Sequence, residues 1–270
     1  MDPGGPGIRE GRGMQPTYVP GHGLLRGRVA TVTAAAGTGI GGACARRLLE
    51  EGARVVISDA HERRLGESLD KLRAEFGDDV TAVPCDVTSE EQVRTLFEVA
   101  EERFGPVDVA VNNAGLGGTA RLAEMTDEQW GRVLDVTLTG TMRCTRAALS
   151  RMQPRGRGVI VNNASVVGWR AQEGQAHYAA AKAGVMALTR CAAVEAAPYG
   201  VRVNAVAPSL AMHPHLAKVT TEELLAELVE DEAFGRYAEP WEVANVIVFL
   251  ASDYSSYMTG EIVSVSSQHP

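Results

Sequence analysis

Short β-branched runs alternate with segments of helical character along most of the chain, and this alternation restricts the possible folds more than any other feature of the sequence. Apolar strands that alternate with helices are typical of a parallel sheet covered by helices on both faces. We therefore expect one α/β domain of the Rossmann type, with a doubly wound, seven-stranded parallel sheet. The predicted strands cover 27–33, 54–59, 80–87, 107–115, 158–165, 201–208 and 261–266.

Capping signals fix the starts of several predicted helices. Thr88 with Glu91 forms a potential capping box for the helix after the third strand. Thr126 with Gln129 does the same for a long helix that runs to about Met152.

Composition and chain ends exclude several classes of protein. The chain of 270 residues has a net charge of −8 and no basic run, so we expect no nucleic-acid partner. No apolar run reaches the roughly 18 residues of a membrane span, so we expect no membrane association. Residues 1–23 are rich in glycine and proline and lack a secretory signal; we predict a flexible extension before the domain at 24–270.

The cysteines are widely scattered and have no metal-ligand spacing, so we predict buried, reduced thiols in a cytoplasmic protein and no metal site. They are Cys44, Cys85, Cys144 and Cys191.

A glycine-rich turn, "TAAAGTGIGG" (33–42), follows the first strand. Gly39 and Gly41 allow close approach of a ligand, and the free N–H groups at the start of the next helix attract a pyrophosphate. A plain helix-capping turn is the alternative. Asp59 ends the second strand, where a carboxylate accepts hydrogen bonds from an adenosine ribose and repels a 2′-phosphate. This favours NAD; NADP remains the alternative because Arg63 and Arg64 follow closely.

The motif "HYAAAK" (177–182) places Tyr178 and Lys182 on one helical face, with Cβ atoms about 5–6 Å apart. An ammonium about 5 Å from a phenol contributes roughly 3 kcal/mol at an effective dielectric constant of about 20, or about two pKa units. We therefore expect Lys182 to lower the pKa of Tyr178. Ser165 lies at the end of a strand on the ligand-binding edge of the sheet, where its hydroxyl can hold a substrate oxygen.

Together with "NNAG" (112–115) and "VNAVAPS" (203–209), these features make residues 25–265 resemble the short-chain dehydrogenase/reductase family. The resemblance implies catalysis by Ser165, Tyr178 and Lys182, hydride transfer between an alcohol or ketone and NAD or NADP, and a homotetramer. It also implies a set of cofactor-binding residues, which are Thr33, Gly39, Ile40, Gly41, Asp59, Asp86, Val87, Asn113, Ala114, Gly115, Tyr178, Lys182, Pro208 and Ala211.

The chain departs from the family's usual pattern at several positions. Ala34–Ala36 replace a glycine and lengthen the turn by one residue, Thr137 stands where an asparagine usually serves a proton relay, and His213 replaces a usual threonine. These segments, with "SSQHP" at the end, resemble actinobacterial enzymes of steroid catabolism that act on a CoA thioester of the C/D-ring remnant. A 3-oxoacyl thioester reductase and a non-catalytic dinucleotide-binding sensor are the alternatives.

The segment 210–236 is predicted to cover the substrate as a lid, or else to pack as an amphipathic helix on its own domain. Trp169 and Arg170 follow the candidate serine closely. Both residues either contact substrate, with Arg170 near a phosphate of the thioester, or lie on the surface. His177 is expected to face away from Tyr178.

Overall fold

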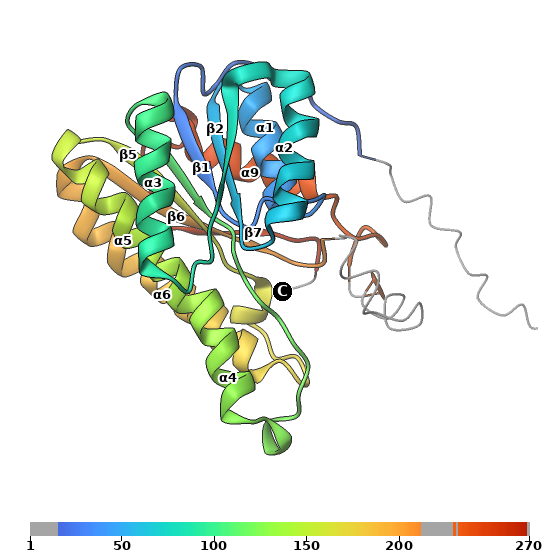
Figure 1. Cartoon of the computed structure of the whole chain (residues 1–270). Coiled ribbons are helices and arrows are strands. Elements are labelled where there is room, and N and C mark those ends of the chain that lie inside the picture. Colours follow the sequence, from blue (N-terminus) through green and yellow to red (C-terminus); the bar gives the residue numbers. More distant parts are fainter. Residues whose placement is uncertain (1–15, 212–228, 231, 269–270) are drawn as a thin grey trace, which may run out of the picture.

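The computed structural model describes residues 16–211, 229–230 and 232–268, and these contain one parallel sheet of seven strands (Figure 1). The strand order is β3-β2-β1-β4-β5-β6-β7, so the chain reverses direction across the sheet between β1 and β4. This confirms the predicted fold class. The strands are β1 (Val29–Val32), β2 (Arg54–Asp59), β3 (Val80–Pro84), β4 (Val109–Asn112), β5 (Gly158–Asn163), β6 (Val201–Pro208) and β7 (Ile262–Val265).

Helices cover both faces of the sheet, and alternate residues of each strand supply the two cores. In β1, Ala30 and Val32 pack toward α1, α2 and α9, whereas Val29 packs toward α3, α5 and α6. Both apolar layers are continuous because the strands are buried on both sides. The helices are α1 (Ile40–Glu50), α2 (Glu62–Phe76), α3 (Glu90–Phe104), α4 (Asp127–Leu134), α5 (Gly140–Met152), α6 (Ala176–Ala196) and α9 (Pro240–Ala251).

One predicted cap is confirmed and the other is wrong. Thr126 and Gln129 form the expected capping box at the start of α4. At the start of α3, however, the side chain of Ser89 accepts the helical N–H of Gln92 at 3.3 Å. The hydroxyl of Thr88 instead donates to the carboxylate of Asp86 at 2.8 Å, because the chain turns one residue later than expected.

A π-helical turn, Asp135–Thr139, interrupts the long helix predicted from Thr126 to about Met152 and separates α4 from α5. The buried hydroxyl of Thr137 accepts the N–H of Leu116 at 2.9 Å and donates to its carbonyl oxygen at 3.1 Å. This clasp connects the helix to the loop after β4. Because the Thr137 hydroxyl donates its one proton to the Leu116 carbonyl, this proton is already engaged in the clasp.

The chain before β1 is attached to α1. The phenol of Tyr18 donates to Glu50 at 2.5 Å, and the N–H groups of His22 and Leu24 donate to the buried Glu51 at 2.8 and 3.0 Å. Residues 16–23, which belong to the predicted extension, therefore make specific contacts, and the rest of that extension lies outside the described residues. Most of the predicted lid, 212–228 with residue 231, also lies outside them. None of the helices in the described part of the chain has the length and apolar character needed to cross a bilayer.

Candidate active site

Asparagines connect the carboxyl ends of three neighbouring strands, β1, β4 and β5. The hydroxyl of Thr33 accepts the N–H groups of Asn113 and Ala114, each at 3.0 Å. The amide of Asn163 donates to the side-chain oxygen of Asn113 at 2.8 Å. The carbonyl oxygen of Asn163 in turn accepts the Nζ of Lys182 at 2.5 Å. This network fixes the glycine-rich turn and the lysine to one edge of the sheet.

The glycine-rich turn is tight, and its geometry requires glycine at Gly41. A Cβ atom there would collide with the carbonyl oxygen of Ala34 and the side chain of Asn113. Gly39, the N-cap of α1, makes no side-chain cap, so the first N–H groups of the helix remain available for an anion. Ala34 occupies the left-handed region with φ at +52°, where this chain lacks the usual glycine.

Asp59, the last residue of β2, contacts the same turn. One carboxylate oxygen accepts the N–H of Ala36 at 3.2 Å and the other accepts the N–H of His61 at 2.9 Å. The Nη2 of Arg64 lies 4.0 Å from that second oxygen.

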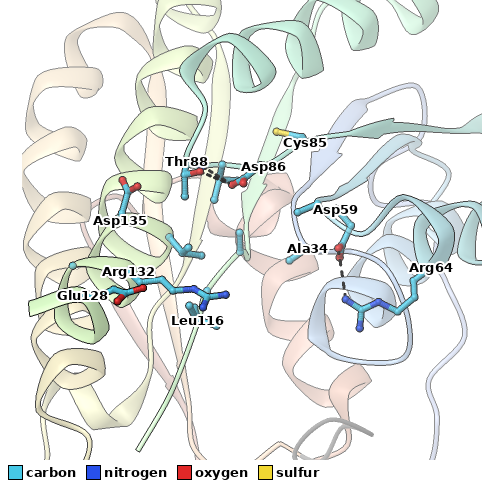
Figure 2. A pocket seen from close by; sticks show the side chains of 16 residues that line it. Ala34, Asp59, Arg64, Cys85, Asp86, Thr88, Leu116, Glu128, Arg132 and Asp135 are labelled. Carbon is cyan, nitrogen blue, oxygen red and sulfur yellow. Dashed lines mark hydrogen bonds and ion pairs between the residues drawn. The ribbon is translucent and has the colours of Figure 1, made fainter. Parts of the chain in front are cut away.

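A cavity of about 920 Å³ opens beside Asp59 and Arg64 (Figure 2). Glu128 and Arg132 of α4 face it from the opposite side. Its volume and its carboxylate at the end of β2 suit the adenosine part of a dinucleotide. The cavity brings together a first group of the predicted cofactor residues, which are Asp59, Asp86, Val87, Ala114 and Gly115.

A second cavity, of about 390 Å³, contains both Ser165 and Tyr178. Ser165 follows β5 and accepts the N–H of Val167 at 3.3 Å, which leaves its own proton free to be donated. Tyr178 lies in the first turn of α6 and is half-buried. The cavity also gathers a second group of the predicted cofactor residues, Ile40, Pro208 and Ala211.

Lys182 is buried, and its Nζ lies 5.5 Å from the centroid of the Tyr178 ring. The pair therefore shares one face of α6, as the spacing predicts. The expected pKa shift of the tyrosine is wrong, however. Burial raises the pKa of Tyr178 to about 12, although the Ser165 hydroxyl acts in the opposite direction. Burial also lowers the pKa of Lys182 to about 8. Loss of solvation is the main cause of the raised pKa of Tyr178, and the ammonium of Lys182 is directed at the carbonyl of Asn163.

The remaining predicted positions divide into three cases. Thr33, Gly39 and Gly41 line neither cavity and instead belong to the glycine-rich turn. Asn113 also lines neither cavity, and its side chain donates to the carbonyl oxygens of Thr33 and Ala34 in that turn. Trp169 is exposed. His213 lies outside the described residues.

His177, which is expected to face away from Tyr178, is buried and lines a third, smaller cavity with Arg132. One residue of the site carries a signal that sequence reasoning passed over. Asn163 has no role in the sequence-based account, although the doublet Asn162-Asn163 at the end of an apolar strand marks buried amides that need partners. The described residues contain no group of three or more His, Cys, Asp or Glu side chains that could hold a metal ion. The prediction that all four cysteines are buried is wrong for Cys191, which is exposed on α6.

Comparisons with known proteins agree with this geometry. Residues 34–267 match the family model described as Enoyl-(Acyl carrier protein) reductase. The chain is 64% identical, over 94% of its length and 98% of the relative, to the (5R,7aS)-5-hydroxy-7a-methyl-1-oxo-2,3,5,6,7,7a-hexahydro-1H-indene-carboxyl-CoA reductase of Mycobacterium tuberculosis. It is 43% identical, over 88% of its length and 94% of the relative, to cis-4-hydroxycyclohexanecarboxylate dehydrogenase of Sinomonas cyclohexanicum.

Solved structures extend the agreement to three dimensions. A short-chain dehydrogenase from Mycobacterium smegmatis superimposes with a TM-score of 0.85 at 60% identity, covering 96% of this chain and 99% of that one. The motif set, the doubly wound sheet and these similarities lead to one conclusion: the chain belongs to the short-chain dehydrogenase/reductase family and is an oxidoreductase.

Proposed function

We propose that this oxidoreductase interconverts a ring ketone and the corresponding secondary alcohol, with Tyr178 as the acid and base and Ser165 as the group that holds the reacting oxygen. The observation that carries the proposal is the shared cavity of Ser165 and Tyr178, with Lys182 buried on the same face of α6.

Each of these side chains has a distinct task in the proposed reaction. The hydroxyl of Ser165 donates to the substrate oxygen, because its own oxygen is already occupied as an acceptor of the Val167 N–H. Tyr178 gives its proton to that oxygen during reduction and takes it back during oxidation. Its pKa of about 12 keeps the phenol protonated at neutral pH, so Tyr178 has a proton to donate in ketone reduction. A bound nicotinamide supplies the hydride for the carbonyl carbon.

The buried lysine has a positioning task. Its ammonium donates one hydrogen bond to the carbonyl of Asn163, and its remaining N–H groups are available to a ribose hydroxyl beside Tyr178. The short link from Lys182 through Asn163 to Asn113 joins this contact to the glycine-rich turn.

NAD is the proposed cofactor, within a family that uses NAD or NADP. Asp59 supports this choice, since its carboxylate lines the larger cavity and would repel a 2′-phosphate. Titration with NADH and NADPH, followed by nicotinamide fluorescence, tests the choice. Tighter binding of NADH, with a preference that shrinks in Asp59→Ala, is the expected result. Tighter NADPH binding would instead assign Arg64 to the phosphate.

The proposed substrate is the CoA thioester of a hydrindane acid, the fused-ring remnant of the steroid C and D rings. The support is the 64% identity to a reductase named for such a thioester and a cavity of about 390 Å³, large enough for a ring system. The family resemblance supports a homotetramer, which light scattering of the purified protein tests. A cytoplasmic location is also proposed.

Turnover with NADH and a panel of oxo-acyl-CoA thioesters tests the substrate. Faster reduction of ring ketones than of linear 3-oxoacyl thioesters is the expected result. A preference for linear 3-oxoacyl thioesters would make the protein a fatty-acid-type reductase. Cofactor binding without any turnover would favour the sensor.

A further inference from the structure

Arg170 is the only charged side chain among the described residues that line the cavity of Ser165 and Tyr178. The segment after β5 positions it: the N–H of Arg170 donates to the carbonyl of Val166 at 3.0 Å, immediately after the short 3-10 turn Val166–Gly168. The side chain is half-buried, so this arginine is not a simple surface residue.

Only one side of the guanidinium is engaged within the part of the chain that the structure describes. The Nη1 of Arg170 donates to the Oε1 of Gln268 at 2.6 Å, and Gln268 lines the same cavity. The Nε and Nη2 groups make no hydrogen bond to any described residue. An arginine held in this way presents a pair of parallel N–H donors, which matches a carboxylate or carbonyl oxygen.

The C-terminal segment that holds Arg170 is itself anchored. Gln268 forms an antiparallel bridge with Glu232, and the hydroxyl of Ser267 donates to the buried carboxylate of Glu232 at 2.7 Å. The other oxygen of Glu232 accepts the N–H of Leu210 at 3.3 Å, and Leu210 is part of the cavity wall. The position of Arg170 is therefore set by a bonded network that reaches back to the loop after β6.

We propose that Arg170 binds an acceptor oxygen on the substrate's own ring skeleton, either a carboxylate or the carbonyl of a thioester, while the reacting oxygen lies at Ser165 and Tyr178. This inference rests on the proposed function and specifies its substrate class: a ring alcohol or ketone that also carries a carboxyl-derived group. Both relatives described above have names that combine a ring hydroxyl with a carboxyl group.

A phosphate of CoA is the less suitable partner for Arg170. The long pantetheine arm separates the thioester from the phosphates, whereas Arg170 shares one cavity of about 390 Å³ with the reacting residues. That space holds a ring and its direct substituents. The guanidinium therefore binds the group that is attached to the ring. Gln268 acts as a positioning residue, because it accepts a hydrogen bond from the guanidinium.

Binding to the NADH complex tests this assignment without requiring turnover. The probes are cyclohexanecarboxylate, its CoA thioester, CoA alone and the neutral cyclohexanemethanol, and the readout is the change in NADH fluorescence. We expect Arg170→Met to weaken the binding of at least one of the two carboxyl probes by about 10- to 100-fold, the effect of losing a charged hydrogen bond. The probe that is weakened identifies the oxygen as carboxylate or thioester. Cyclohexanemethanol and CoA should be unaffected.

Matched variants separate recognition from general damage. Arg170→Lys keeps the charge but loses the fork and should recover only part of the affinity. Gln268→Leu should give a smaller loss than Arg170→Met, and Arg190→Met, an exposed change of the same net charge on α6, should give none. Melting temperatures confirm that each variant is folded.

The proposal is overturned if both carboxyl probes bind Arg170→Met as tightly as they bind the unmodified protein. It is also overturned if both carboxyl probes bind the unmodified protein no more tightly than cyclohexanemethanol does. An equal loss for CoA alone would assign Arg170 to a phosphate and overturn it too. These binding results do not depend on turnover. If no substrate of the turnover panel reacts, the proposed function fails, but the assignment of Arg170 is still tested by binding.

Discussion

Ala34 holds the only left-handed backbone conformation of a non-glycine residue in the described part of the chain. The Cβ of an L-residue crowds the following carbonyl there, at a cost of about 1–2 kcal/mol. The alanine stands in the glycine-rich turn, between Thr33 and Gly41, so the strain lies at the candidate cofactor site.

We expect Ala34→Gly to raise the free energy of unfolding by about 1 kcal/mol, because it removes the strain of the positive φ. Ala36→Gly, two residues later at ordinary φ, should lower it by about 0.5–1 kcal/mol. Urea unfolding of both variants measures the two effects. A loss of stability in both variants would show that Ala34 is unstrained.

The buried ammonium of Lys182 should make stability depend on pH. Its pKa of about 8 lies below the unfolded value of about 10.5, so the unfolded chain binds more protons between these values. Stability from this group therefore rises with pH across that window. Lys182→Met removes the titration but also the hydrogen bond to Asn163.

We expect the free energy of unfolding of Lys182→Met, relative to the unmodified protein, to fall by about 2–3 kcal/mol between pH 7 and pH 10. Tyr178 titrates in both proteins and cancels from the difference. Urea unfolding at the two pH values measures it. A difference that is independent of pH would mean that Lys182 is not buried as an ammonium.

At this scale the sequence predicts which side chains meet but not how they are solvated. The four-residue spacing predicts that Tyr178 and Lys182 lie on one face of a helix, and the structure places both on one face of α6. The direction of the ammonium depends on Asn163, which is distant in sequence and belongs to another element, so helical spacing cannot predict it. Burial of Tyr178 likewise depends on the whole domain.

The element with the largest departure from its prediction is the helix between β4 and β5. A capping box and helical periodicity predict one helix, and nothing local marks the π-helical turn at Asp135–Thr139. The turn coincides with the clasp between Thr137 and Leu116, a contact between distant segments. Such turns often occur at functional sites, and Leu116 lines the larger cavity.

We expect Thr137→Val, which keeps the shape of the side chain, to lower the free energy of unfolding by about 1–3 kcal/mol, because two backbone groups of Leu116 lose their partner. NADH affinity should fall as well, since Leu116 lines the larger cavity. Thr141→Val, which removes a hydrogen bond within the helix, is the control and should leave NADH affinity unchanged. An unchanged free energy of unfolding in Thr137→Val would show that the clasp between Thr137 and Leu116 does not stabilise the fold.

Across the whole molecule, the order of strands brings residues from distant parts of the sequence to one edge of the sheet. The alternation of strands and helices suffices to predict this, since ligands bind at the carboxyl ends where the strand order reverses. Two other sets of contacts are not predictable in this way, namely those of Gln268 with Arg170 and of Glu51 with residues 22–24. Each set attaches a segment without regular secondary structure, near one end of the chain, to a distant residue.

Glu51 anchors the chain before β1. Burial acts to raise the pKa of its carboxyl, but the N–H groups of Leu24 and His22 and the charge of Arg47 outweigh it, so the pKa lies below its usual value. The group therefore stabilises the fold above its unfolded pKa and loses that contribution as pH falls through the folded pKa.

We expect Glu51→Gln to lower the free energy of unfolding at neutral pH by about 3 kcal/mol, with a difference that shrinks in acid. The exposed Glu98→Gln, from a surface ion pair, should change it by at most about 0.5 kcal/mol. Thermal and urea unfolding at neutral and acid pH measure both. An equally small effect of Glu51→Gln would show that the anchor is dispensable.

Tyr178→Phe tests whether Tyr178 carries the proton of an alcohol/ketone reaction. The measurement is kcat for NADH-dependent reduction of a ring ketone, together with the Kd of NADH. We predict a loss of about 10²–10⁴ in kcat, the usual contribution of a general acid, with nearly unchanged NADH affinity. Turnover near the rate of the unmodified protein would contradict it.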